Sequence, residues 1–396
     1  MRLNKDDRVI FHIDMNNFYA SVECLINPSL KNYAVAVAGD PNKRSGIILA
    51  KNYIAKAFGI KTAEVIWQAK QKCPTLVCVA PHFEEYEKYS KLAHDIYYKY
   101  TDKIEPFGID ECWLDITDSL KLFDCTPEEL APKIQKQIKD ELGLSVSIGI
   151  SFGKTLAKLG SDMKKPMGLI VIDRDNHLDI LKRLKVDDMI MIGKHTSQKL
   201  REMNILSLYD LYSQREDFLV EKFGIVGKYL LNAVSGIDDD TIYSPNDEDV
   251  KSVGNGETAP RDLLDLDDIS KWLHDLSSRV SYRLREKGMS AKTIHLSIKY
   301  ADFTYSGAQS TKTYYFSNEN DIYEFSFEIF KSLAGSKFPP VRALRISATN
   351  LIKHDEDRQV NLFTNNKQEN LCKAIDLIKH KFGNNIISLG SDTQNK

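Results

Sequence analysis

Residues 9–26 read Val-Ile-Phe-His-Ile-Asp-Met-Asn-Asn-Phe-Tyr-Ala-Ser-Val-Glu-Cys-Leu-Ile, a strand pattern followed directly by a helix pattern. Apolar residues alternate over residues 9–14, which predicts a strand. From Phe18 they recur at i, i+4, i+7 and i+8, which predicts a helix. Asp14 therefore lies where a strand ends and a helix begins, and it is the first candidate for a functional side chain.

A second candidate is the adjacent carboxylate pair Asp110 and Glu111, within a segment over residues 103–117 that predicts a hairpin turning near Gly108. Neighbouring strand residues point to opposite faces, and burying unpaired carboxylates is costly. Both can serve one site only at a turn or bulge, which a glycine allows. Together with Asp14 they would form a cluster that needs a hard divalent cation as counter-charge.

The spacing alone leaves another interpretation open. Asp110 could simply end a turn, with Glu111 a solvated hairpin residue. Carboxylates by themselves also do not distinguish a nuclease from a polymerase or a cyclase.

The composition excludes several classes of protein. The chain has 396 residues and a formal net charge of −2, which predicts two to four domains and argues against a surface that is basic everywhere. Its N-terminus has no apolar segment typical of a secretory signal, and no apolar run approaches the roughly 18 residues of a membrane helix. The six cysteines form no CxxC pair and no zinc spacing, which predicts reduced thiols in a cytoplasmic protein.

The small net charge conceals an uneven distribution along the chain. Residues 154–201 carry 11 basic and 6 acidic side chains, residues 202–268 carry 5 and 16, and residues 269–354 carry 13 and 7. One basic block would be ordinary solvated surface. Two basic blocks separated by an acidic one favour a protein that contacts a polyanion in two places.

Strand and helix patterns alternate along most of the chain, which predicts an α+β multidomain protein. The first 170 residues predict a mixed domain built on an antiparallel sheet, with a helix over residues 127–142 that ends at Gly143. Residues 178–236 predict short helices with glycine turns. An acidic, turn-rich linker follows. Residues 251–351 then predict a small α+β domain with helices over 269–287 and 320–333.

Four segments in order resemble the motifs of the Y-family DNA polymerases, closest to the UmuC-like branch of the catalytic subunit of bacterial DNA polymerase V. Residues 14–23 resemble the opening motif, residues 109–115 and 147–166 the second and third motifs, and residues 50–60 the fingers helix. Asn16, where many members have a second Asp, is one of the features that favour this branch.

The resemblance implies a right hand with palm, fingers, helical thumb and an additional α+β little finger. It implies the following division: palm 1–15 and 84–174, fingers 16–83, thumb with a helix-hairpin-helix 175–236, linker 237–250, little finger 251–354 and C-terminal tail 355–396.

The resemblance also implies a reaction. Asp14, Asp110 and Glu111, with the backbone carbonyl of Met15, would hold two Mg²⁺ ions. The primer 3′-hydroxyl would attack the α-phosphate of a dNTP opposite a template base, with low fidelity and no proofreading, and the role would be translesion synthesis in DNA repair and the SOS response.

Substrate contacts follow from the same motifs. Tyr53, Lys56 and Lys165 match positions that bind the triphosphate, although the family usually has Arg at the place of Lys56. Tyr19 matches the steric gate, a ring under the sugar that leaves no room for a 2′-hydroxyl.

Partner contacts are implied in three places. Gly193, Lys194 and Lys199 in the thumb, and Arg342 and Arg345 in the little finger, would contact the backbone of primer-template DNA. A tail motif resembles the peptide that bacterial polymerases insert into the sliding clamp, the beta subunit; its residues are Gln359, Val360, Asn361, Leu362 and Phe363. An amphipathic helix over residues 371–382 has no assigned role, and accessory mutagenesis subunits are further candidate partners.

The sequence leaves two competing functions open. The first is a catalytically silent clamp- and DNA-binding accessory factor in damage tolerance, against which the intact carboxylates argue. The second is a metal-dependent nuclease, which would shorten a DNA strand instead of extending it.

Overall fold

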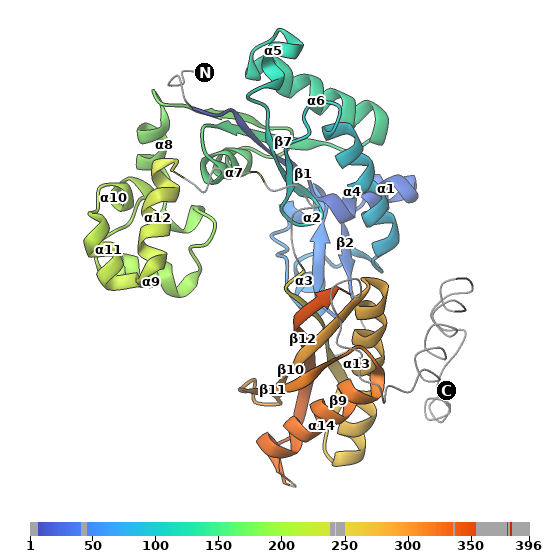
Figure 1. Cartoon of the computed structure of the whole chain (residues 1–396). Coiled ribbons are helices and arrows are strands. Elements are labelled where there is room, and N and C mark those ends of the chain that lie inside the picture. The colour runs from blue at the N-terminus through green and yellow to red at the C-terminus, as the bar shows by residue number, and fades with distance from the viewer. Residues whose placement is uncertain are drawn as a thin grey trace. The chain divides into compact units, whose positions relative to one another are not determined.

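The computed structural model describes residues 7–40, 46–237, 242, 250–335 and 337–353 and the single positions 378 and 381. The chain divides into two compact units, Met1–Glu248 and Asp249–Lys396 (Figure 1). Each unit has its own hydrophobic core, so each is described separately. The prediction of an α+β multidomain chain is confirmed.

The largest sheet of the N-terminal unit has five strands in the order β5-β6-β1-β7-β8. These strands are β5 (Ile104–Pro106), β6 (Glu111–Asp115), β1 (Ile10–Met15), β7 (Val146–Ser151) and β8 (Leu169–Ile172). Neighbours are antiparallel except β7 and β8, which are parallel. The expected antiparallel sheet is therefore present, with one parallel edge strand that the sequence pattern did not predict.

Helices cover both faces of this sheet (Figure 1). On one face, Phe11 and Ile13 of β1 join the largest core with residues of α4 (Phe83–Tyr97) and α6 (Pro127–Leu142). On the other face, Ile10 packs with Ala157 of α7 (Lys154–Met163). Because side chains alternate along a strand, the polar residues of β1 point toward α7.

Local sequence signals define where the helices near this sheet begin and end. Helix α1 (Phe18–Ile26) begins after Asn17, whose left-handed backbone (φ 49°) is one that asparagine tolerates. Helix α6 begins with a capping box of Thr126 and Glu129 and ends at Gly143 in the left-handed region, as the sequence predicted. A short helix, α5 (Ser119–Phe123), precedes it.

A second, three-stranded sheet in the order β3-β2-β4 has its own small core. Its elements are β2 (Val35–Ala38), β3 (Ile48–Lys51), β4 (Val77–Val79), α2 (Tyr53–Ala57) and α3 (Ile66–Lys72). Helix α2 starts at Asn52, whose side-chain oxygen accepts a hydrogen bond from the amide of Ala55.

The last part of this unit is helical, as predicted. Its helices are α8 (His177–Arg183), α9 (Lys194–Glu202), α10 (Leu208–Tyr212), α11 (Glu216–Phe223) and α12 (Ile225–Ser235). Their apolar side chains share a core with Phe152 and Leu156, so this helical region is anchored to the end of β7 and to α7.

The C-terminal unit is a four-stranded antiparallel sheet in the order β11-β10-β12-β9, packed against two helices. Its elements are β9 (Ser252–Leu263), α13 (Leu266–Glu286), β10 (Met289–Tyr300), β11 (Tyr305–Phe316), α14 (Glu319–Ala334) and β12 (Val341–Lys353). Both predicted helices are present, whereas β9 was not predicted as a strand.

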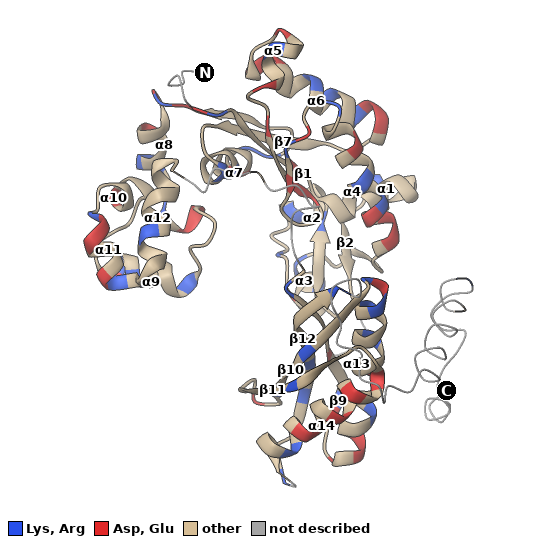
Figure 2. Ribbon diagram, viewed as in Figure 1, with Lys and Arg blue, Asp and Glu red and all other residues tan. Residues whose placement is uncertain are grey.

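The ionic side chains of this unit are distributed unevenly between its strands and helices (Figure 2). Strands β10, β11 and β12 contain Lys and Arg but no Asp or Glu. The two helices carry charges of both signs. Three of the four strands of this sheet therefore carry only basic ionic side chains, whereas β9 also carries Glu257 and Asp262.

Two exclusions from the sequence can be compared with the structure. All five cysteines in its described part are free thiols, and three of them are buried. No helix in the described residues is long and apolar enough to cross a membrane. The cytoplasmic location stays a prediction.

Candidate active site

The three predicted carboxylates meet at one end of the five-stranded sheet. Asp14 and Glu111 are directly opposite each other in the antiparallel pair of β1 and β6. Asp110 lies just before β6, and its carbonyl accepts a hydrogen bond from the amide of Met15 at 3.0 Å. The turn before it contains Gly108 at φ +92°, so the predicted glycine turn brings both adjacent carboxylates to one site.

These carboxylates line a cavity of about 350 Å³ within the N-terminal unit. Five further residues predicted for the site line it as well: Met15, Tyr19, Tyr53, Lys56 and Lys165. Leu49 and Lys51 of β3 and Thr62 in a turn complete the wall. The cavity therefore collects the predicted metal, sugar and triphosphate residues in one place.

Two lysines neutralise the carboxylates. Lys158 of α7 is buried, and its Nζ lies 2.8 Å from Glu111 Oε1 and 3.5 Å from Asp14 Oδ2. Lys165 Nζ lies 2.7 Å from the same Asp14 oxygen. Both lysines also pair with Asp162, each at 3.0 Å. Alternating charges thus form a network that holds the end of the sheet to α7.

His12 lies beside this network and contacts both α7 and Glu111. Its ring is fully buried, its Nδ1 lies 2.8 Å from Ser161 Oγ, and its Nε2 lies 3.5 Å from Glu111 Oε2. Burial lowers the pKa of His12, despite the opposing effect of Glu111. The imidazole is therefore a neutral polar neighbour of Glu111 near pH 7.

Burial and pairing shift the pKa values of the two opposed carboxylates in opposite directions. Burial raises the pKa of Asp14 to about 7, and Lys165 and Lys158 oppose that rise. Burial also acts to raise the pKa of Glu111, but the neighbouring His12 and the ion pair with Lys158 outweigh it and lower this pKa to about 2. Perturbed carboxylates gathered in a cavity are typical of a functional site.

Close packing of α7 on β7 places Lys158 under the carboxylates. A Cβ at Gly149 would overlap the backbone carbonyl of Ala157. Glycine at this position therefore lets the helix approach the sheet, and one helical residue later Lys158 reaches Asp14 and Glu111.

The donor set fits a hard divalent cation in its chemistry. Carboxylate and carbonyl oxygens are the ligands that Mg²⁺ prefers. In the described residues, however, no three His, Cys, Asp or Glu side chains come together as a closed metal site. The ammonium groups of Lys158 and Lys165 lie against these oxygens instead, so a cation would have to compete with Lys165 for Asp14.

Asn16, where the family often has Asp, is buried and faces neutral partners. Its Oδ1 accepts a hydrogen bond from Ser147 Oγ at 3.0 Å and lies 3.4 Å from the hydroxyl of Tyr53. An amide is suited to this setting because it adds no further negative charge to the buried carboxylates. Asn16 therefore links β1 and β7 to the phenol that lines the cavity.

Not every predicted residue is at this cavity. Gly193 is the N-cap of α9, followed by the exposed Lys194, while Lys199 donates to the carbonyl of Lys222. In the other unit, Arg345 is exposed on β12, and the guanidinium carbon of Arg342 lies 4.8 Å from the ring centroid of Phe303. The clamp motif over residues 359–363 lies outside the described residues.

Sequence reasoning did not assign a role to Lys158, Asp162 or His12. The alternation of β1 places His12 on the face of Asp14, and the i, i+4 spacing of Lys158 and Asp162 on a helix indicates an ion pair. Both signals are visible in the sequence. Neither reveals that the partners are buried beside Glu111.

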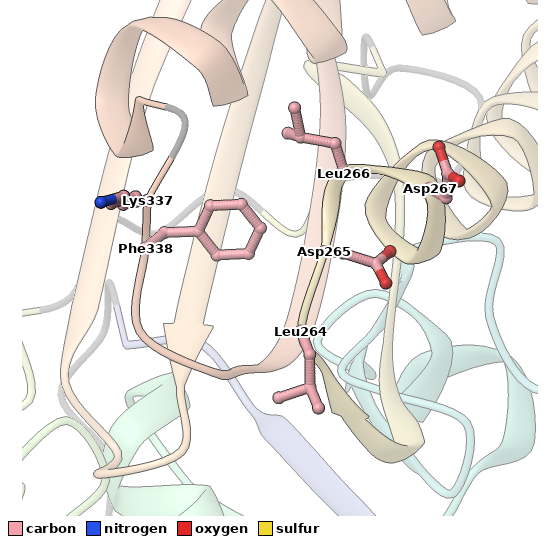
Figure 3. A pocket seen from close by; sticks show the side chains of 6 residues that line it. All are labelled: Leu264, Asp265, Leu266, Asp267, Lys337 and Phe338. Carbon is pink, nitrogen blue, oxygen red and sulfur yellow. The ribbon is translucent and has the colours of Figure 1, made fainter.

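Another cavity, of about 570 Å³, lies in the C-terminal unit (Figure 3). Its lining residues are Leu264, Asp265, Leu266, Asp267, Lys337 and Phe338. Asp265 already accepts the amide of Asp268 as the N-cap of α13, and Figure 3 shows Lys337 directed away from the ring of Phe338. This cavity lacks the convergent charged groups of the carboxylate site.

The chain was compared with known proteins. The sequence profile of the impB/mucB/samB family matches residues 13–162, and that of the family's C-terminal domain matches residues 250–362. DNA polymerase IV of Acetivibrio thermocellus is 41% identical over 383 residues, covering 95% of each chain. DNA polymerase IV 1 of Bacillus subtilis strain 168 is 36% identical over 388 residues, covering 97% of this chain and 93% of its own.

A solved Y-family DNA polymerase chimera shares the fold. It superposes with a TM-score of 0.78 at 24% sequence identity and covers 87% of this chain and 99% of its own. The relatives just described carry the name DNA polymerase IV, so they do not confirm the expected closeness to the branch of polymerase V. By its sequence and fold, this chain belongs to the impB/mucB/samB family, the bacterial Y-family DNA polymerases.

Proposed function

We propose that the cavity around Asp14, Asp110 and Glu111 is the catalytic centre of this translesion DNA polymerase. The observation that carries the proposal is the convergence of three carboxylates, three lysines and Tyr19 on one cavity of about 350 Å³. The reaction is attack of a primer 3′-hydroxyl on the α-phosphate of a dNTP, with pyrophosphate leaving.

Asp14, Asp110, Glu111 and the carbonyl of Met15 are the proposed ligands of two Mg²⁺ ions. When bound, such ions activate the attacking oxygen and stabilise the leaving one. The chain contributes a rigid frame, because the three carboxylates are fixed by β-pairing of β1 and β6 and by a glycine turn. Lys158 remains beneath them, where it offsets part of their repulsion.

Lys165 is proposed to exchange its ion-pair partner, from Asp14 to the triphosphate of the incoming nucleotide. It is one-quarter exposed and pairs with Asp14 in the absence of substrate. Release toward a phosphate would exchange one charge-assisted hydrogen bond for another and free Asp14 for the metal. Lys56, which is exposed at the same cavity, and Tyr53 would contact the remaining phosphate oxygens.

Tyr19 is the proposed steric gate. Its ring lines the cavity, and a ring under the sugar leaves no room for a 2′-hydroxyl. The consequence is selection of dNTPs over rNTPs without a hydrogen bond to the missing group.

Further contacts concern partners. Gly193, Lys194 and Lys199 in the thumb and Arg342 and Arg345 in the little finger are proposed to contact the DNA backbone, which makes binding salt-dependent. Strands without acidic residues in the C-terminal unit support the second group. The partition into palm 1–15 and 84–174, fingers 16–83, thumb 175–236 and little finger 251–354 is part of the same proposal.

A primer-extension assay with Mg²⁺ tests the catalytic centre. Glu111→Gln and Asp14→Asn should each lower the extension rate by at least about 10³-fold, roughly 4 kcal/mol of transition-state stabilisation. Asp124→Asn is the matched control, because Asp124 is exposed with a left-handed backbone that asparagine also tolerates. Extension by either site variant at the rate of the control would refute the assignment.

The same assay separates the competing functions. A silent accessory factor would bind primer-template without extending it, in the parent as well as in the variants. A nuclease would produce strands shorter than the primer. Extension by the parent that requires a dNTP and a divalent cation excludes both.

A further inference from the structure

The proposed steric gate, Tyr19, belongs to a group of four side chains in contact between two neighbouring helices, α1 and α4. Tyr19 and Glu23 are four residues apart on α1, and therefore on the same side of that helix. His82 and Tyr86 are four residues apart at the start of α4. Each helix thus presents a pair of side chains to the other.

The first contact is a ring stack. The rings of Tyr19 and Tyr86 are parallel within 13°, with centroids 4.3 Å apart. Phe83 meets Tyr19 edge-on at 6.1 Å and Tyr86 edge-on at 5.7 Å. Tyr86 is fully buried, whereas Tyr19 is only partly buried at the cavity. The gate ring therefore rests on a ring that cannot move into solvent.

The second contact fixes Tyr86 itself. Its hydroxyl donates a hydrogen bond to the carboxylate of Glu23, which is only 3% exposed. His82 Nδ1 lies 2.9 and 3.0 Å from the two oxygens of the same carboxylate. A buried carboxylate is tolerated only with such partners, so removal of one of them is costly. Glu23 therefore anchors the far end of the Tyr86 ring, one helical turn from the gate.

We propose that Tyr86, held by Glu23, is a positioning residue that sets the discrimination between deoxyribonucleotides and ribonucleotides. This inference rests on the proposed gate function of Tyr19. A ring excludes a 2′-hydroxyl only while it stays in place. Tyr86 prevents the Tyr19 ring from tilting back, and Glu23 prevents Tyr86 from making room for it.

The test compares kcat/KM for dCTP and CTP opposite a template guanine. Tyr86→Leu removes the stack and should lower the dCTP/CTP ratio by about 10-fold, the upper range for an aromatic pair. Incorporation of dCTP itself should stay within about threefold of the parent, since the pair acts on sugar selection. Tyr89→Leu, the same change on the same helix, is the control. In the described residues the ring of Tyr19 contacts the rings of Phe18, Phe83 and Tyr86, and Tyr89 is not among them.

Milder variants cover the case in which Tyr86→Leu does not fold. Tyr86→Phe keeps the stack and loses the hydroxyl, and Glu23→Gln keeps an acceptor and loses the charge. Each should lower the dCTP/CTP ratio by about fivefold, which corresponds to a net hydrogen-bond contribution near 1 kcal/mol. A ratio equal to that of the parent in both variants would overturn the anchoring role.

A double mutant separates positioning from general structural support. In Tyr19→Ala the gate is gone, so adding Tyr86→Leu should lower the dCTP/CTP ratio no further. An additive loss would contradict the inference. If Tyr19→Ala alone leaves the ratio unchanged, the gate proposal itself is wrong; if it relaxes the ratio while Tyr86→Leu does not, only the positioning role is wrong.

Discussion

The side-chain nitrogen of Lys158 lies 2.8 Å from Oε1 of Glu111, and this partly buried ion pair joins α7 to the first residue of β6. The same nitrogen lies 3.5 Å from Oδ2 of Asp14 on the neighbouring strand. One ammonium group thus serves two carboxylates that face each other across the sheet. Their mutual repulsion would otherwise oppose the pairing of β1 and β6 at its functional end.

Lys158→Met tests this role. Methionine keeps most of the side-chain volume but leaves the buried Asp14 and the partly buried Glu111 without their shared cation, so the free energy of unfolding should fall by about 3 kcal/mol. Urea denaturation without divalent metal measures the loss. Mg²⁺ should then raise Tm more in the variant than in the parent, because a cation replaces the missing charge.

Lys164→Met is the matched control for Lys158→Met. Lys164 is exposed at the end of the same helix, so its replacement should change the free energy of unfolding by less than about 0.5 kcal/mol. Equal stability of the two variants would contradict a bridging role for Lys158.

Gly149→Ala should disrupt the packing that brings Lys158 to the carboxylates. A Cβ at this position would overlap the Ala157 carbonyl and crowd the amide of Ser161, both of which belong to the backbone of α7. Backbone cannot rotate away, so the cost should reach or exceed the ~1–3 kcal/mol of an overpacked core. A fall in Tm together with slower primer extension is expected.

Gly193→Ala provides the comparison for Gly149→Ala. Its φ is −77°, and no heavy atom lies within 4 Å of its ideal Cβ. This variant should keep the Tm of the parent to within a few degrees, since the Cβ meets no other atom and the poorer N-cap preference of Ala costs only about 1 kcal/mol. A parent-like Tm for Gly149→Ala would show that α7 can shift without loss.

Much of this site could be predicted because local patterns define it. The alternation in β1, the periodic apolar residues of α1 and the glycine before Asp110 predict both the elements and the meeting of the carboxylates. Helix α6 has the predicted bounds, since a proline start and a glycine end are local signals as well.

The features that could not be predicted depend on distant parts of the chain. Strand β9 contains Gly254, Gly256 and Pro260, which disfavour a strand, and it is ordered by pairing with β12 about ninety residues later in the sequence. The contact of Lys158 with Glu111 likewise depends on how α7 crosses the sheet. No local pattern shows that a lysine within a helix becomes buried beside a carboxylate.

Lys165→Met should separate substrate binding from chemistry. The ammonium group is proposed to move from Asp14 to the triphosphate, so its loss removes a charge-assisted hydrogen bond of about 1.5–3 kcal/mol. KM for dNTP should rise by roughly 10- to 100-fold, while binding of primer-template DNA stays unchanged. Steady-state kinetics and a DNA-binding titration measure the two quantities. A rise in KM that Lys165→Arg fails to rescue in part would argue that Lys165 acts through packing rather than charge.

The clamp motif gives a prediction about processive synthesis. Leu362 and Phe363 would form an apolar anchor for a pocket on the sliding clamp, with Gln359 as its polar contact. Such a small contact should bind with a Kd around micromolar, about 8 kcal/mol. The chain as a whole carries a net charge of only −2, and basic side chains clearly outnumber acidic ones only in residues 154–201 and 269–354, so it should hold DNA loosely without a tether. The double variant Leu362→Ala with Phe363→Ala should therefore reduce synthesis when the clamp is loaded on the primer-template. Synthesis without the clamp should stay unchanged, because tethering raises the effective concentration of the polymerase without altering its active site. Asn366→Ala is the control, since this position lies outside the motif over residues 359–363. An equal loss of synthesis with and without the clamp would show that these residues support the polymerase itself.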